Sequence, residues 1–481
     1  MMRFLDLIEH PDLLPTVPRR LLAGAVVLGL ILYCALVGAL LGTGRLMPAV
    51  GLIGLPAMVI AAAFAIRYFS TLVLVLPLTA LAMAFATIPV GNASQLPISM
   101  LITIGLAGIW LVRMLTKRAW EVVPTPFNRP LLLFMGACII SFPWGILWAD
   151  PFLNWQIMGS FRVAQTASLL SFLALMSLPF LVGRFIDRPW KVWFYLWSFI
   201  ICGTLMTLTQ TFSIRQGFLA DQGLWGLWFV LSLAGAALVH PGVPWYARLL
   251  GLGVLGLHLN LAVLRNSLWL SGWLPTLLGL AAMLFLHSRK IFVLLMVVVL
   301  PFAALGPGRA YLEKVAADNV EEGGLGRLEI WRRNLTIASQ HWLFGTGPAG
   351  YAVYNMTYYR DDARSTHNNY FDILAQFGVV GSALWVWFMG SSLWYGWKTV
   401  QRAPPGLART VAIIATAGWA AAMASMMLGD WVLPFFYNQG IIGFRYTAYS
   451  WFFLGLLVVA RRMVDEQAGA GQPLPGPANE D

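Results

Sequence analysis

Charged residues and cysteines are both scarce in this chain. Only 11% of its 481 residues are charged, whereas 59% are hydrophobic, which is more apolar surface than a soluble core could bury. A soluble globular protein is therefore excluded. The three cysteines lie apart from one another in apolar stretches and imply no disulfide framework, and the six histidines include no pair at metal-ligand spacing.

The hydrophobic residues are collected into long runs. Runs of about 17 to 25 apolar residues can cross a bilayer as helices, which satisfy their own backbone hydrogen bonds in lipid. We predict about 14 such spans, and hence an all-α polytopic membrane protein. The spans are expected near residues 21–41, 48–66, 69–90, 96–115, 130–148, 164–183, 192–212, 224–240, 249–286 (a pair), 291–306, 373–397, 410–428 and 446–460.

Alternate loops carry most of the Lys and Arg residues, including those at 184–191, 398–409 and 461–462. Because short cytoplasmic loops hold this excess, both termini are predicted to be cytoplasmic. The same alternation places residues 307–370 outside, together with residues 429–445. The net charge of +11 does not indicate nucleic-acid binding, since the basic residues lie at helix ends where topology explains them.

The predicted organisation has four parts. Residues 1–306 hold eleven transmembrane helices, 307–370 form a large external helical loop between two late helices, and 371–462 hold the last three helices. Residues 463–481 are rich in Gly, Pro, Ala and Gln and are predicted to be a disordered cytoplasmic tail.

An amphipathic helix is expected in the external loop, because apolar residues recur there at three- and four-residue steps. These residues are Leu328, Trp331, Leu335, Ala338 and Trp342. Such a helix could lie on the membrane surface or roof a cavity. Arg327, Trp331 and Asn334 share helical spacing, so they could project toward one target. The alternative is that the arginines only solvate the helix or meet lipid phosphates.

Two further motifs follow that helix. Residues 345–350 match the dinucleotide pattern G-x-G-x-x-G, but they lie outside, follow a helix and contain Pro348, so we interpret them as a turn. His367 stands just before the helix that re-enters the membrane, which Thr366 or a polar neighbour could cap. Its unperturbed pKa of about 6.5 would let it accept a proton near neutral pH, although an ordinary surface histidine is the alternative. The external acidic residues show no spacing that selects a carboxylate pair for glycoside hydrolysis.

These motifs resemble the O-antigen ligase and polymerase superfamily of bacterial membrane glycosyltransferases. The resemblance lies in residues 326–331 (GRLEIW), 342–351 (WLFGTGPAGY), 367–370 (HNNY) and 378–381 (GVVG), in that order. It also implies an arginine at an external helical hairpin upstream. Arg265 occupies that place, although Leu264 precedes it where the family usually has a small or hydroxyl residue.

The resemblance implies a GT-C-like enzyme of the bacterial inner membrane, with its catalytic loop in the periplasm and no metal or cofactor. Its donor would be a glycan on undecaprenyl diphosphate, and its acceptor a hydroxyl of lipid A core or another glycan. Arginine suits a leaving diphosphate because it donates two parallel hydrogen bonds to one phosphate. The predicted roles are diphosphate binding by Arg265 and Arg327, proton acceptance by His367, and substrate contact by Arg332, Arg364, Asn368, Trp331 and Asn334.

Alternatives from the same and from other classes stay open. A polymerase of the same superfamily would hand the glycan to another carrier-linked repeat, whereas an O-antigen ligase-like enzyme is the preferred interpretation. A polysaccharide flippase or transporter would share the many spans, but such proteins place ionisable residues near the mid-bilayer, and here they cluster at the outer face. A receptor or scaffold loop is a third possibility.

Overall fold

A computed structural model describes residues 63–90, 94–153, 155–220, 222–265, 270–305, 308–311, 313–314, 325–359 and 364–470. The chain divides into two compact units, one of residues 1–73 and 105–121 and a larger one of residues 74–104 and 122–481. The span expected at 21–41 and most of that at 48–66 lie outside the described residues. The candidate site lies wholly in the larger unit.

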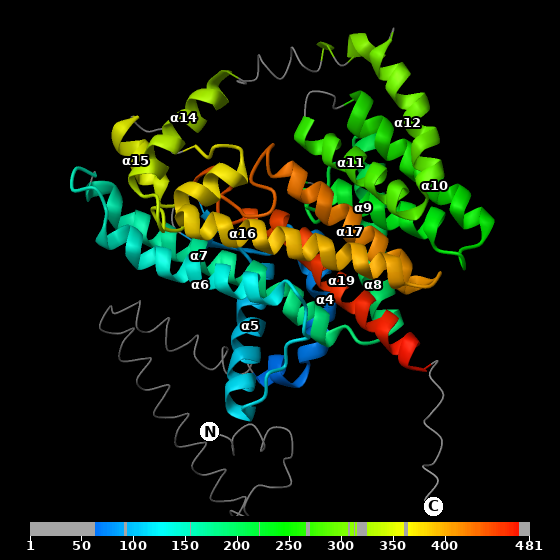
Figure 1. Ribbon diagram of the computed structural model, residues 1–481, viewed down its shortest axis with the longest axis horizontal. Helices are drawn as coiled ribbons and strands as arrows, with labels where there is room; N and C mark the ends of the chain where they lie inside the picture. Colours follow the sequence, from blue (N-terminus) through cyan, green and yellow to red (C-terminus); the bar gives the residue numbers. More distant parts are fainter. Residues whose placement is uncertain are drawn as a thin grey trace, which may run out of the picture. The chain divides into compact units, whose positions relative to one another are not determined.

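Helices account for nearly all of the described chain (Figure 1), which confirms the predicted fold class. In order they are α4 (Phe69–Leu81), α5 (Ile98–Lys117), α6 (Asn128–Leu147), α7 (Trp155–Phe185), α8 (Pro189–Thr211), α9 (Trp225–Ala234) with the π-helical turn η2 (Gly235–Val239), α10 (Trp245–Leu259) with the π-helical turn η3 (Asn260–Arg265), α11 (Leu270–His287), α12 (Arg289–Ala304), α14 (Leu325–Gln340), α15 (Tyr351–Tyr358), α16 (Asn369–Arg402), α17 (Leu407–Ser425), α18 (Phe436–Gln439) and α19 (Gly443–Ala470). Within the described residues, nine helices are long and apolar enough to cross a membrane.

Three helix boundaries differ clearly from those expected from the sequence, and one of them is the start of α7, which lies at Trp155 where residue 164 was expected. The span predicted at 69–90 is shorter, because α4 ends at Leu81 and an antiparallel hairpin of β1 (Thr87–Val90) and β2 (Ser94–Pro97) follows, with Thr87 opposite Pro97. The β-branched residues of β1 favour that extended conformation. At the other end, α19 continues to Ala470, so the first residues of the predicted tail are helical.

Among the described spans, α17 and α19 are the most buried, with 78% and 83% of the residues in their most apolar stretches buried inside the protein. Helix α19 packs against α7 and α17, and α17 also packs against α11. Close approach of α7 and α19 rests on reciprocal glycines: a Cβ on Gly183 would lie 2.9 Å from Val458, and one on Gly455 would lie 2.5 Å from Val182. Because lipid tails are as apolar as leucine, such close packing of small residues is what associates helices in a membrane.

Helix α16 is kinked at Gly378, whose φ of 65° and ψ of −164° are not helical. The turn after α14 packs into this kink, with Val379 N donating to Trp342 O at 2.7 Å and Thr346 N donating to Ala375 O at 2.9 Å. A Cβ on Gly345 would lie 2.4 Å from the backbone of Gln376. Residues 345–350 are therefore a tightly packed turn, as interpreted from the sequence.

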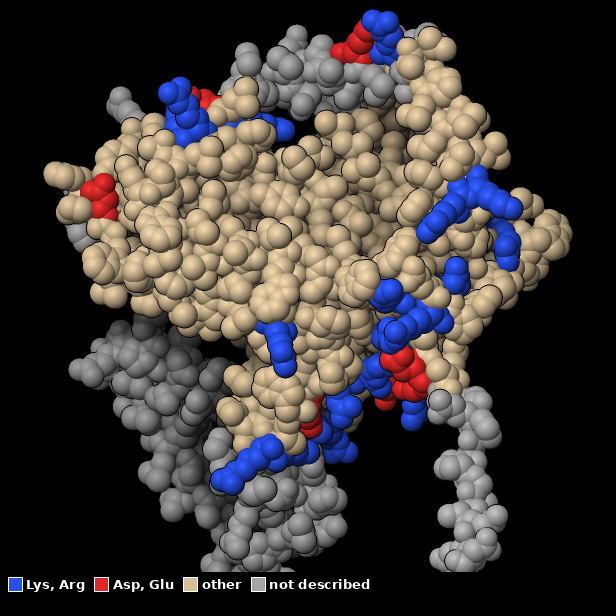
Figure 2. All heavy atoms as spheres, in the orientation of Figure 1, with Lys and Arg blue, Asp and Glu red and all other residues tan. Residues whose placement is uncertain are grey.

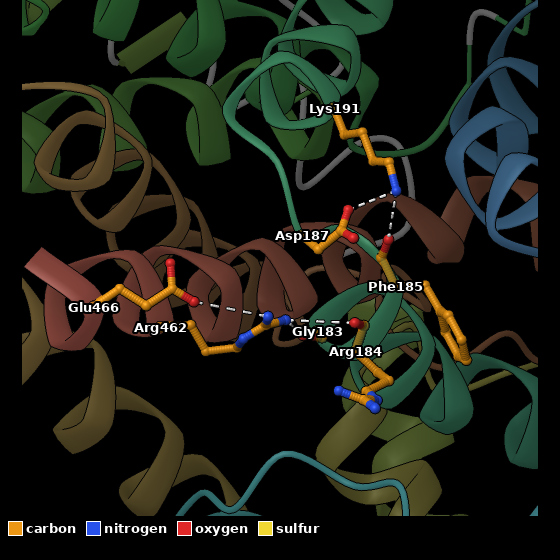
Figure 3. A network of polar contacts seen from close by, with 7 residues as sticks. All are labelled: Gly183, Arg184, Phe185, Asp187, Lys191, Arg462 and Glu466. Atoms are coloured by element: carbon orange, nitrogen blue, oxygen red, sulfur yellow. Dashed lines mark hydrogen bonds and ion pairs between the residues drawn. The ribbon is translucent and has the colours of Figure 1, made fainter.

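Loops predicted to be cytoplasmic lie at the C-terminal end of α16, and loops predicted to be external lie at its N-terminal end. At its C-terminal end, Arg462 Nη1 of α19 donates to Gly183 O at 2.8 Å, and Lys191 pairs with Asp187 at 2.6 Å (Figure 3). At its N-terminal end, Asn369 Nδ2 donates to Leu433 O at 2.8 Å, joining residues 364–370 to residues 429–439. Figure 2 shows Lys and Arg gathered where the C-terminal parts of α16 and α19 lie, beside a broad surface without charge.

Candidate functional site

Residues 364–369, where α16 begins, are held by hydrogen bonds to α16 itself and to residues 432–433. Asn368, and not Thr366, caps the helix, since its Oδ1 accepts from Tyr370 N at 3.0 Å. The carboxamide of Asn369 accepts from Val432 N and Leu433 N at 3.2 Å each. The side chains of Thr366, Asn368 and Asn369 are all buried. His367 is thus a partly buried side chain on a rigid backbone segment.

His367 has a left-handed backbone conformation, with a φ of 51°. A non-glycine residue in this region costs about 1 to 3 kcal/mol, and such outliers cluster at functional sites. Neither ring nitrogen hydrogen-bonds to another described residue. Burial lowers the pKa of His367, and so do the positive charges of Arg327 and Arg364, against the opposite effect of Asp372. The imidazole is therefore neutral near pH 7 and able to accept a proton.

The arginines predicted to surround His367 differ in their surroundings. Arg327 is partly buried and Arg364 is exposed, and both lie close enough to His367 to depress its pKa. Arg327 forms no ion pair with any described carboxylate. Arg333, in contrast, pairs with Glu329 at 3.0 Å and lies 4.4 Å from the ring centroid of Tyr359. Arg327 and Arg332 are the cations of α14 that form no ion pair with a described carboxylate and are left available to an anionic ligand.

Trp331 braces α14 against the His367 segment. Its Nε1 donates to Thr366 O at 2.8 Å, and its ring lies 5.1 Å from that of Phe371 at an interplanar angle of 30°. Together with Arg332, which is exposed, these two rings line an open groove of about 480 Å³. The remaining lining residues are Leu328, Leu335, Thr336 and Ser339. This groove is mainly apolar and has one cation on its wall.

The apolar stripe predicted on α14 lies mostly on its exposed side, and of its members only Ala338 is fully buried. Leu328, Leu335 and Trp342 are 58%, 44% and 60% exposed. The buried face consists of Ile330, Asn334, Ile337 and Ala338. Asn334 is only 1% exposed, and neither its Oδ1 nor its Nδ2 hydrogen-bonds to another described residue, which is rare for a buried amide.

Arg265 stands where the sequence predicts it, at the tip of a hairpin between α10–η3 and α11. Its side chain is exposed. Among the described residues, no hydrogen bond, ion pair or ring contact joins Arg265 to His367 or Arg327. The structure thus brings His367, Arg327 and Arg364 into one electrostatic environment and leaves Arg265 outside it.

A buried pair of carboxyl groups, Asp372 and Asp430, lies behind the His367 segment, and each is 1% exposed. The two side chains hydrogen-bond to each other, which requires a proton on one of them. Burial and the negative charge of Asp372 raise the pKa of Asp430 well above its usual range, so Asp430 holds the proton.

Each carboxyl of the pair is also hydrogen-bonded to the surrounding segments. Asp372 Oδ1 accepts from Tyr351 Oη at 2.5 Å and from Thr366 Oγ1 at 2.7 Å. Asp430 bonds to Ser365, and its Oδ2 accepts from Asn438 Nδ2 at 3.2 Å. The pair therefore ties the two residues before His367 to α15, α16 and the segment that follows α17.

Sequence reasoning missed this pair. The available signal was an ionisable residue at the start of an apolar span, because such residues are rare in membrane helices and usually functional or paired. The described residues contain no group of three or more His, Cys, Asp or Glu side chains arranged to hold a metal ion.

Residues 247–386 match the protein family described as O-antigen ligase. The matched segment runs from α10 into α16, and it contains Arg265, Arg327, His367 and Asp372 but not Asp430. No curated protein matches the chain. The resemblance found in the sequence motifs is thereby confirmed.

Proposed function

We propose that the chain, whose residues 247–386 match the O-antigen ligase family, is an O-antigen ligase-like glycosyltransferase. The family supports a membrane-embedded glycan transferase of the ligase or polymerase type acting on lipid-linked glycans. Our finer proposal is that the donor is a glycan on undecaprenyl diphosphate and that the acceptor is a hydroxyl of lipid A core or a similar glycan, at the outer face of the inner membrane.

In the proposed reaction, the acceptor hydroxyl gives its proton to His367 while its oxygen attacks the anomeric carbon of the donor sugar. The bond between that carbon and the phosphate oxygen breaks, undecaprenyl diphosphate departs, and the anomeric configuration inverts. The base must be within hydrogen-bond reach of the hydroxyl and uncharged. His367 meets the second condition because burial and Arg327 lower its pKa.

Arg327 is proposed to bind the departing diphosphate, with Arg364 and Arg332 as further contacts and Arg265 reaching in from its hairpin. The diphosphate leaves as a stabilised anion, so fixed cations aimed at its oxygens contribute more than a general acid. Arg327 and His367 would also act by holding donor and acceptor in one place. The apolar groove beside Arg332 suits the first isoprene units of the carrier, whose diphosphate would lie toward Arg327.

The observation that carries this proposal is the state of His367. Its ring is partly buried, its nitrogens bond to no described residue, and its backbone is held in a strained conformation beside Arg327. A surface histidine without a role has no reason to keep such a conformation against its energetic cost.

The test is glycan transfer by the full-length protein purified in detergent, with a carrier-linked donor, an acceptor and no ATP. His367→Asn is the sharpest variant, because asparagine tolerates the left-handed conformation. We expect transfer to fall by at least about 100-fold, the range of a lost general base, with an unchanged unfolding midpoint. Arg333→Gln is the matched control, since Arg333 is already paired with Glu329. Transfer by His367→Asn at the wild-type rate would refute the proposal.

Lipid-linked glycans in cells lacking the gene separate a ligase from a polymerase. Long chains left on the carrier indicate a ligase, whereas accumulated single repeat units indicate a polymerase. Accumulation of the carrier-linked glycan at the cytoplasmic face would indicate a flippase instead.

A further inference from the structure

A second pocket lies at the end of α16 opposite His367. It has a volume of about 350 Å³, within the range of small-ligand sites. Its lining includes Trp394, Lys398, Arg402, Arg461, Arg462 and Asp465. At about 1.5 Å per residue, Lys398 lies about 40 Å along α16 from Asn369. That distance exceeds the hydrocarbon thickness of about 30 Å, so this pocket is distinct from the candidate catalytic site.

Positive charge is in excess in this pocket. Arg461 Nε pairs with Asp465 at 2.8 Å. Arg462 Nη1 donates a hydrogen bond to Gly183 O at 2.8 Å (Figure 3). Lys398 and Arg402, one helical turn apart on α16, form no ion pair with any described carboxylate. Two cations therefore converge on the pocket without a protein counter-ion, which favours an anionic ligand.

One wall of the pocket is formed by an exposed tryptophan at the surface of the helix bundle. The ring of Trp394 is 57% exposed, and Lys398 Nζ lies 4.5 Å from its centroid. Tryptophan with a neighbouring lysine is typical of the membrane–water interface, where the ring meets acyl chains and the cation meets headgroups. A ligand that enters here comes from the bilayer edge, with its anionic group at the height of Lys398 and Arg402.

We propose that this pocket binds the phosphodiester headgroup of an anionic phospholipid, with Lys398 and Arg402 on the phosphate and Trp394 against the upper acyl chain. Basic pockets between membrane helices recognise such headgroups, and an arginine donates two parallel hydrogen bonds to one phosphate. A zwitterionic lipid is disfavoured, because its ammonium would face the same cations. This site does not depend on the proposed catalytic function.

Titration of the full-length protein with phosphatidylglycerol, followed by native mass spectrometry, tests the proposal. Each cation near a phosphate contributes about five-fold to binding, so the double variant Lys398→Gln/Arg402→Gln should bind this lipid about 30-fold more weakly. Arg402→Lys keeps the charge and should keep most of the binding. The matched control is Lys117→Gln/Arg118→Gln, a basic pair outside the pocket, which should bind like wild type.

Four outcomes would overturn the proposal. These are undiminished binding by a double variant with a normal unfolding midpoint, an equal loss in the Lys117→Gln/Arg118→Gln control, equal binding of phosphatidylcholine, and displacement of phosphatidylglycerol by inorganic phosphate at equal concentration. The last would mark a site for a soluble anion. Because wild-type protein suffices for the two ligand comparisons, the proposal stays testable even if the double variant does not fold.

Discussion

Replacing Asp430 with asparagine should remove a pH-dependent part of this protein's stability. In the folded chain Asp430 shares a proton with Asp372, and burial raises its pKa well above its usual range. In the unfolded chain the same carboxyl loses its proton near pH 4. Above that pH the folded state binds one proton more than the unfolded state, so stability falls as pH rises until the folded pKa of Asp430 is passed.

The magnitude follows from this one-proton difference. While the unfolded carboxyl is ionised and the folded one is protonated, the contribution of Asp430 to the free energy of unfolding falls by about 1.4 kcal/mol per pH unit. The Asp430→Asn variant would keep the geometry: the new amide nitrogen would donate to Asp372, and the amide oxygen would accept from Asn438. Asp430→Ala, in contrast, would remove a hydrogen-bond partner of the Ser365 hydroxyl, the Asn438 amide and the Asp372 carboxylate. Each loss should lower the free energy of unfolding by about 1 to 3 kcal/mol.

The assay is thermal unfolding of the purified protein across pH 5 to 7 in one detergent. Relative to the Asp430→Asn midpoint, the wild-type midpoint should fall with rising pH, and the Asp430→Ala midpoint should be lowest throughout. Glu329→Gln is the control, since Glu329 is a half-exposed partner of Arg333 whose loss should leave the wild-type slope. Parallel pH profiles of wild type and Asp430→Asn would refute the shared proton.

Two further predictions concern the same end of the molecule. Because burial and Arg327 lower the pKa of His367, the pH at which the transfer rate falls on the acidic side should lie below 6.5. Arg327→Gln should move this pH upward, whereas Arg327→Lys, which keeps the charge, should not. An unchanged acidic pH dependence in Arg327→Gln would contradict the electrostatic link between the two residues. Gly378→Ala should destabilise the protein by at least about 3 kcal/mol, since Gly378 has a φ of 65° and an added Cβ would lie 2.3 Å from Leu343 O. The control is Gly390→Ala, whose Cβ would meet no atom within 4 Å and which should leave the thermal unfolding midpoint unchanged.

Helix positions were predictable from the sequence because length and apolarity alone decide which segments cross a bilayer. The packed face of α14 was not. A helix at a membrane edge exposes leucine to lipid as readily as it buries it, so hydrophobicity does not mark the packed face. Leu328 and Leu335 are accordingly exposed, while Asn334 is buried. Three residues of the predicted stripe, Leu328, Trp331 and Leu335, line the groove, so the periodicity marks the groove and not the face packed against the protein.

The candidate site was predictable only as far as its residues fall into motifs. His367 and Arg327 lie in recognisable sequence motifs. Their electrostatic interaction, in contrast, became evident only from the structure. Asp430 follows α17 and carries no local pattern, and its partnership with Asp372 depends on tertiary packing alone. A buried carboxyl pair is invisible in a sequence because neither member reveals the other.

The segment that matches the O-antigen ligase family is therefore not sufficient to hold the candidate base in place. Residues 247–386 contain His367, but the bonds that position it include several from residues after α17: Asp430 bonds to Ser365, and Asn369 makes three hydrogen bonds with Val432 and Leu433. Since those bonds keep His367 in a strained conformation, a chain cut after residue 386 would release the strain. The candidate site and the last two membrane helices therefore form one structural unit.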